Sequence, residues 1–161
     1  MIPNILILGL GNVLLTDEAV GAEVVRRLET ATDPSTSLRF LDGGTLSFTL
    51  AVPIGESQGL IVVDAAVMGD APGSIRVFEG DAMDRQLSHP AKSVHEVSLS
   101  DLLDMARLTN SLPARRALVA IEPERVDWGE HLTPAVDAAV PIAMLRVREI
   151  VSRWTTEDDQ E

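Results

Sequence analysis

Cysteine is absent from this chain of 161 residues, and so is tyrosine. Without cysteine, the chain cannot form a disulfide framework, a zinc–thiolate site or a cysteine nucleophile. Aromatic residues make up only 3% of the sequence and hydrophobic residues 45%, so aliphatic side chains must build the core. Such a composition suits helices packed on a buried parallel sheet. The length fits one domain.

Basic residues are also scarce: 13 Lys and Arg stand against 25 Asp and Glu, which gives a formal net charge of -12. This charge repels nucleic acid and anionic lipid and favours cations and basic partners, so we expect neither a nucleic-acid nor a membrane partner. The apolar run at 5–8 is too short to cross a bilayer, and no basic segment precedes it. We therefore expect a cytoplasmic monomer whose first strand is buried.

Strand-like and helix-like segments alternate along most of the chain. The predicted strands are 5–8, 38–41, 60–63, 74–78 and 117–121, and the predicted helices are 17–29, 45–54, 98–108 and 134–154. The alternating pattern of 74–78 indicates an antiparallel edge strand, and 81–94 reads as a long loop. The order predicts an α/β fold: a three-layer sandwich with a mostly parallel five-stranded sheet and helices on both faces. A single domain spans 1–154, and 155–161 forms an acidic, flexible tail.

Acidic residues follow the first three predicted strands. Glu18 comes after the first, Asp42 after the second and Asp64 directly after the third, while His95 lies in a later loop. In parallel sheets the functional crevice lies beyond the carboxyl ends of the strands. Two carboxylates and one imidazole suit a divalent first-row metal and leave coordination positions open. The alternative is structural: acidic residues cap a helix or accept bonds from loop amides.

The segment Gly9-Leu10-Gly11 also resembles the start of a dinucleotide-binding loop. A third glycine would be needed at position 14, where the chain has Leu14, although Asp42 is placed like a ribose-binding acid. No G-x-S-x-G elbow is present, so a Ser-His-Asp hydrolase has no support. A nucleotide-binding Rossmann-like enzyme thus stays open as an alternative.

Several blocks of the sequence resemble the hydrogenase maturation endopeptidases. The first and most specific is GLGNVLLTDEAVG at 9–21. The others follow in the family's order over roughly residues 5–150: DGGT at 42–45, VVDA at 62–65, SVH at 93–95 with LSDLL at 99–103, IEPE at 121–124 and LTPAV at 132–136. The chain departs from the usual pattern at Ser47 and Ser98, where many relatives have glycine, which puts the local loop shape in question.

The resemblance implies a hydrolase that removes a C-terminal extension from the large-subunit precursor of a nickel–iron hydrogenase after nickel insertion. It implies a metal-recognition site formed by Glu18, Asp64 and His95, with nickel contributed by the precursor and other divalent ions substituting in vitro. The position of Asp42 is functionally sensitive in the family. Glu18, Asp42 and Asp64 are therefore the candidate catalytic residues of an aspartic-type endopeptidase, and no other cofactor is expected.

We assign Asp42 a hypothetical role as general base or orienting acid, with the amides of Gly43 and Gly44 stabilising an oxyanion. The run 122–125 reads as a solvated loop, and Trp128 and Trp154 read as packing or rim residues. A non-catalytic protein that binds the nickel-loaded large subunit as a checkpoint is the alternative from a different functional class.

Overall fold

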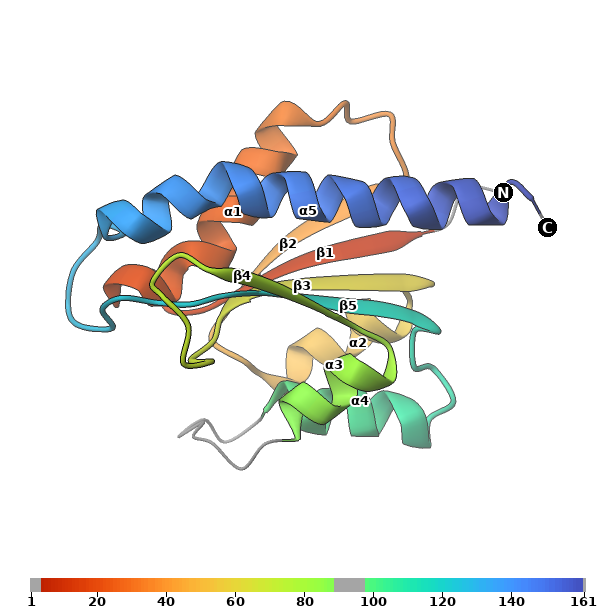
Figure 1. Cartoon of the computed structure of the whole chain (residues 1–161). Coiled ribbons are helices and arrows are strands. Elements are labelled where there is room, and N and C mark those ends of the chain that lie inside the picture. The colour runs from red at the N-terminus through yellow and green to blue at the C-terminus, as the bar shows by residue number, and fades with distance from the viewer. Residues whose placement is uncertain (1–3, 89–97, 161) are drawn as a thin grey trace.

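A computed structural model describes residues 4–88 and 98–160 (Figure 1). The strands are β1 (Ile5–Leu10), β2 (Leu38–Gly44), β3 (Gly59–Ala65), β4 (Ile75–Glu79) and β5 (Arg115–Ile121). The 3-10 helices are η1 (Thr16–Ala19) and η2 (Phe48–Leu50), and the α-helices are α1 (Val20–Ala31), α2 (Ala51–Gly55), α3 (Asp81–Leu87), α4 (Leu99–Leu108) and α5 (Pro134–Asp158).

The five strands form one sheet in the order β2-β1-β3-β5-β4. All neighbours are parallel except β4, which pairs antiparallel with β5 at the edge, as its alternating pattern predicts. The helices α1 and α5 lie on one face, and α2, α3 and α4 lie on the other (Figure 1). The predicted three-layer α/β sandwich is confirmed.

Each face of the sheet has its own aliphatic core, because successive side chains of a strand point to opposite faces. Ile5, Ile7 and Val63 pack with α1 and α5. Leu6 and Leu8 pack with the helices of the other face. None of the helices in the described part of the chain is long and apolar enough to cross a membrane.

The first turn of α1 packs directly on the backbone of the sheet. A Cβ atom on Gly21 would lie 2.2 Å from the carbonyl oxygen of Val63 and 2.6 Å from that of Leu10. A Cβ atom on Gly9 would lie 2.5 Å from the carbonyl oxygen of Gly21. Two facing glycines therefore let α1 begin against β1 and β3, at the edge where the predicted site residues gather.

The prediction of a loop over 81–94 is wrong for its first half, because α3 occupies Asp81–Leu87. Gly80, with φ of 56°, turns the chain into this helix, and Met83 is fully buried beneath it. Asp84 accepts hydrogen bonds from both Nε and Nη2 of Arg116 at 3.0 and 2.7 Å. Burial of Met83 and the ion pair of the half-buried Asp84 with Arg116 thus stabilise a helix whose sequence lacks a clear apolar stripe.

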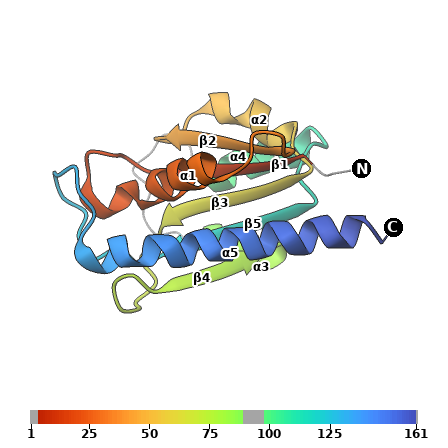
Figure 2. The ribbon, with the colours of Figure 1, turned by 90° about the horizontal axis from the view of Figure 1, so that it is seen from above.

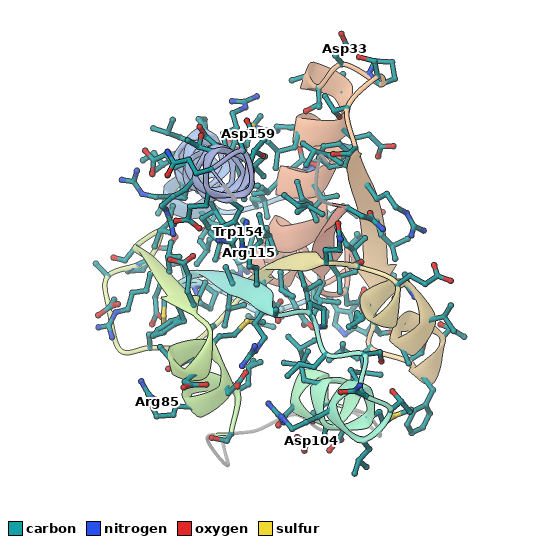
Figure 3. The ribbon with its side chains drawn as sticks, turned by 90° about the vertical axis from the view of Figure 1, so that its right-hand side faces the viewer. Asp33, Arg85, Asp104, Arg115, Trp154 and Asp159 are labelled. Atoms are coloured by element: carbon teal, nitrogen blue, oxygen red, sulfur yellow. The ribbon has the colours of Figure 1, made fainter. Side chains whose placement is uncertain are left out.

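The C-terminal helix continues to Asp158 rather than ending at Trp154, so part of the predicted tail is helical. Trp154 is 4% exposed, and its carbonyl oxygen accepts a hydrogen bond of 2.6 Å from Nη1 of Arg115 (Figure 3). Thr155 donates to the carbonyl of Val151 at 2.7 Å. Contacts with β5 therefore hold the last turns in place, which the polar sequence of this segment does not reveal.

The substitution Gly21→Ala tests the close approach of α1 to the sheet. Alanine normally stabilises a helix by about 1 kcal/mol relative to glycine, but overpacking costs about 1–3 kcal/mol or more. We expect a net loss of about 2 kcal/mol in the free energy of unfolding, because the added methyl would meet backbone atoms rather than a movable side chain. Urea unfolding measures this value, and an unchanged or raised midpoint would contradict the packing described here.

Candidate functional site

The candidate site lies at the edge of the sheet where the parallel strands end. The loop 11–19, which includes η1, and the loop 122–133 lie side by side beyond the strand tips (Figure 2). Gly11 begins the first loop with φ of 120°, and its amide donates to the carbonyl of Gly44 at 2.9 Å. A Cβ atom on Gly11 would lie 1.8 Å from the carbonyl oxygen of Glu18, so only glycine lets the loop fold back this closely.

Asp17 is fully buried and joins the two loops. Its carboxylate accepts hydrogen bonds from the amides of Glu124 and Arg125 at 2.9 and 3.0 Å. It also accepts from the amide and hydroxyl of Thr133 at 2.8 and 2.7 Å. Burial raises the pKa of Asp17, but these donors outweigh it and hold the pKa below its usual value. Asp17 is therefore an ionised anchor for the loop 122–133, and no side-chain hydrogen bond caps η1, in which it lies.

Backbone pairing reinforces this anchor. The amide of Thr16 donates to the carbonyl of Gly129, and the amide of Gly129 donates to the carbonyl of Leu14, both at 2.9 Å. The hydroxyl of Thr16 donates to the carbonyl of Arg125 at 2.6 Å and accepts from the amide of Asp127 at 3.2 Å. Thr16 has φ of 46°, which is rare for a β-branched residue and is maintained here by its bonds on both sides.

The prediction that 122–125 is a solvated loop is wrong at Glu122, which is 6% exposed. Its carboxylate accepts hydrogen bonds from the amides of Met68 and Gly69 at 2.6 and 3.2 Å. The backbone of Glu122 also pairs with Gly73 and Ser74. Glu122 thus fixes the turn that follows β3, immediately beyond Asp64.

Glu18 in η1 and Asp64 near the end of β3 lie at the same edge of the sheet, close enough for the charge of Glu18 to act on Asp64. Burial is the main cause that raises the pKa of Asp64, to about 7, and the nearby charge of Glu18 raises it further against a hydrogen bond from the amide of Ala65. The side chain of Asp64 keeps partial contact with solvent, so a cation can reach it. Two carboxylates whose charges act on each other form a pair that a cation would stabilise.

His95, the predicted third ligand, lies outside the described residues. Among the residues that the structure does describe, no group of three His, Asp or Glu side chains is close enough to hold a metal ion. The oxygen donors of Glu18 and Asp64 fit a divalent cation, and completion of the site requires a further ligand. The assignment of His95 stays a prediction from the sequence.

Asp42 lies apart from this pair. Asp42 on β2 pairs in register with Gly9 on β1, and Gly9 pairs with Val63 on β3. Asp64 is therefore one residue farther along β3 than the residue in register with Asp42. Because neighbouring strands lie about 4.8 Å apart, Asp42 and Asp64 are roughly 10 Å apart across β1. Asp42 shares the α1 face with Val63, whereas Asp64 points to the opposite face by alternation. By their register, Asp42 and Asp64 therefore follow different faces of the sheet.

Asp42 borders a separate hollow of about 560 Å³ beside α1. Val13, Glu130 and His131 line the same hollow. The carboxylate of Asp42 accepts a hydrogen bond of 2.9 Å from the amide of Gly44, which is therefore not free for the predicted oxyanion role. Asp42 is exposed and open to a bound molecule from this hollow.

The glycines of the first loop do not form a phosphate cradle. The amide of Gly11 donates to Gly44, and the amides of Leu14 and Leu15 donate to Asn12 at 2.9 and 3.1 Å. Amides that are already bonded cannot bind a pyrophosphate. The loop is thus built to place Glu18 rather than to hold a dinucleotide.

The serines that replace the family's usual glycines cause no strain. Ser98 caps α4 with a reciprocal capping box, in which its hydroxyl accepts from the amide of Asp101 at 3.1 Å and its amide donates to the Asp101 carboxylate at 3.0 Å. Ser47 precedes η2 with φ of -146°, an extended conformation that any residue adopts. Neither position has a backbone conformation that requires glycine, so serine is compatible with the local loop shape at both.

Comparisons with known proteins agree with the residue blocks noted in the sequence. The family model "Hydrogenase maturation protease" matches residues 22–150. The hydrogenase expression/formation protein HupD of Rhizobium leguminosarum bv. viciae is 32% identical and covers 94% of this chain and 76% of its own. The hydrogenase 2 maturation protease of Escherichia coli is 34% identical over 89% of this chain and 88% of its own.

The fold is shared with the solved hydrogenase maturating endopeptidase HybD from E. coli. The two structures superpose with a TM-score of 0.84 at 34% identity, over 89% of each chain. This likeness supports the five-stranded α/β architecture along almost the whole length.

Replacement of Asp17 by asparagine is expected to destabilise the protein by about 3 kcal/mol, because one amide oxygen cannot accept the four bonds that the carboxylate accepts. The pKa of Asp17 is lower in the folded state, so its stabilising effect is present above about pH 4 and is lost as the pH falls further. Urea unfolding between pH 3 and pH 7 should therefore show a steeper acid loss for the wild type than for Asp17→Asn. Parallel curves would contradict the anchor role.

Replacement of Glu18 by glutamine should lower the pKa of Asp64 in the metal-free protein, because it removes a neighbouring negative charge. Carboxyl carbon NMR titration measures this pKa directly. The matched control is Glu149→Gln, which removes a carboxylate bonded to Arg146 on α5 and should leave Asp64 unchanged. Equal pKa values of Asp64 in all three proteins would show that Glu18 and Asp64 do not interact.

Proposed function

Since the chain belongs to the hydrogenase maturation protease family and is a hydrolase, we propose that it removes the C-terminal extension from the large-subunit precursor of a nickel–iron hydrogenase after nickel insertion. The observation that carries this proposal is the position of Glu18 and Asp64 at the same edge of the sheet, beside two loops that are joined by hydrogen bonds. A protease that recognises a metal ion bound to its substrate needs ligands that are held in place and accessible.

The nickel of the precursor is recognised by Glu18, Asp64 and His95. Carboxylate and imidazole groups are suitable ligands for a divalent first-row metal, and three of them leave positions for groups of the precursor and for water. A precursor without nickel offers no metal for these three residues to bind, so it binds weakly. The interaction of Glu18 with Asp64 supports this role, because a cation between them would relieve their repulsion.

Cleavage requires a water molecule directed at the scissile carbonyl. In this proposal Glu18 and Asp64 orient or deprotonate such a water beside the metal of the substrate, which would supply Lewis-acid polarisation. Asp42, on the opposite face of the sheet, would instead contact the precursor chain from the hollow beside α1. We propose a cytoplasmic monomer for which the net charge of -12 favours a basic cleavage region in the precursor.

The decisive experiment mixes the purified protein with nickel-loaded and nickel-free precursor and follows the intact mass of the large subunit. We expect loss of a C-terminal peptide from the nickel-loaded form alone. Glu18→Gln, Asp64→Asn and His95→Ala should each lower the cleavage rate by at least about 100-fold, the range typical for removal of a metal-site or catalytic group. The surface variant Glu149→Gln is the matched control and should cleave normally.

Each other outcome identifies the part of the proposal that fails. Cleavage of both precursor forms would keep the protease and reject nickel recognition. Binding of the nickel-loaded precursor without loss of mass would favour the non-catalytic checkpoint protein. Normal cleavage by both Glu18→Gln and His95→Ala would reject the assigned site.

A further inference from the structure

The loop 122–133 presents a tryptophan to solvent. Trp128 is 78% exposed, although indole is among the side chains that gain most from burial. Three further apolar residues on the paired loops are also exposed: Val126 at 54%, Val13 at 50% and Leu14 at 46%. We call these four residues the apolar platform. Tryptophan is enriched among the residues that dominate binding energy in protein interfaces.

The apolar platform is rigid, which distinguishes it from an ordinary loop tip. Gly129, next to Trp128, pairs with the backbone of Leu14 and Thr16, and the amide of Asp127 donates to the hydroxyl of Thr16. The buried Asp17 carboxylate fixes both ends of the loop 122–133. A preorganised surface loses little conformational entropy when it binds a partner.

The apolar platform continues into the proposed active site. Leu14 and Glu18 belong to the same short loop, and Val13 also lines the hollow that Asp42 borders. A molecule seated on Trp128 would therefore extend toward both the metal-recognition pair and the hollow beside α1. By contrast, Leu108, 88% exposed, ends α4, which lies on the face of the sheet away from α1 (Figure 1).

The charges around the apolar platform are mostly acidic. Glu124, Asp127 and Glu130 are exposed on the same loop. The neighbouring cation Arg125 is 3.2 Å from the Asp127 carboxylate and is thus partly neutralised. A second copy of this chain would bring the same acidic residues against each other, which costs free energy. The complementary partner has an apolar element flanked by lysine or arginine.

We infer that the apolar platform of Val13, Leu14, Val126 and Trp128 is the docking surface for the hydrogenase large-subunit precursor, which binds through an apolar segment with basic neighbours. This inference rests on the proposed function and adds to it a binding surface outside the metal-recognition site. Docking on Trp128 raises the local concentration of the precursor beside Glu18 and Asp64, and the chemistry of cleavage does not involve the platform.

The test compares Trp128→Ser with the matched control Leu108→Ser, because both remove a large exposed apolar side chain. Binding of nickel-loaded precursor is measured by biolayer interferometry, and cleavage is measured as kcat and KM. For Trp128→Ser we expect Kd and KM to rise by about 10- to 30-fold with kcat within about twofold, as for the loss of an interface hot spot. Leu108→Ser should stay within about twofold of the wild type, and Trp128→Phe should recover most of the affinity.

Thermal unfolding of each variant and light scattering of the wild type complete the test. Unchanged Kd and KM in Trp128→Ser, with normal cleavage, would overturn the docking surface and leave the proposed function intact. A wild-type dimer that Trp128→Ser dissociates would also overturn it, since the platform would then bind a second copy. Wild-type protein that binds precursor through Trp128 without cleaving it would reject the proposed function and keep the docking surface.

Discussion

The buried carboxylate of Asp17 is the interaction on which the organisation of the site depends. A charge with no solvent contact is stable only when hydrogen bonds replace its hydration, and four donors from the loop 122–133 do so. The same bonds set the shape of that loop, the unusual backbone of Thr16 and the position of the adjacent Glu18. Two adjacent residues thus differ in role: Asp17 is a structural acid, and Glu18 is the proposed metal ligand.

The sheet divides the remaining acidic residues between its two faces. Asp64 points away from α1 and interacts with Glu18, whereas Asp42 borders the hollow beside α1. A substrate that contacts both Asp42 and Asp64 must pass over the end of β1. There the two glycines Gly9 and Gly21 let α1 pack closely against the strand. This geometry suits an extended precursor chain whose metal lies on one side of β1 and whose flanking residues lie on the other.

Aliphatic runs and turn residues predicted the five strands, because burial on both faces leaves a clear pattern in sequence, and alternation predicted the antiparallel edge strand. The capping box at Ser98 likewise marks the start of α4. The sequence did not predict α3 or the last turn of α5, since contacts with Arg116 and Arg115 from a distant strand stabilise them. It also could not tell that Asp17 and Glu122 are buried, because their donors are backbone amides that carry no sequence signal.

The assignment of Glu18 and Asp64 as the metal-recognition pair is tested most directly by anomalous X-ray diffraction from crystals of this protein soaked with Ni²⁺. The account predicts one strong anomalous peak between the two carboxylates, with oxygen distances near 2.1 Å and His95 as a further ligand. Loss of that peak in Glu18→Gln crystals would show that the Glu18 carboxylate is needed to bind the ion. A peak at Asp42 and His131 instead, or none at Asp64, would contradict it.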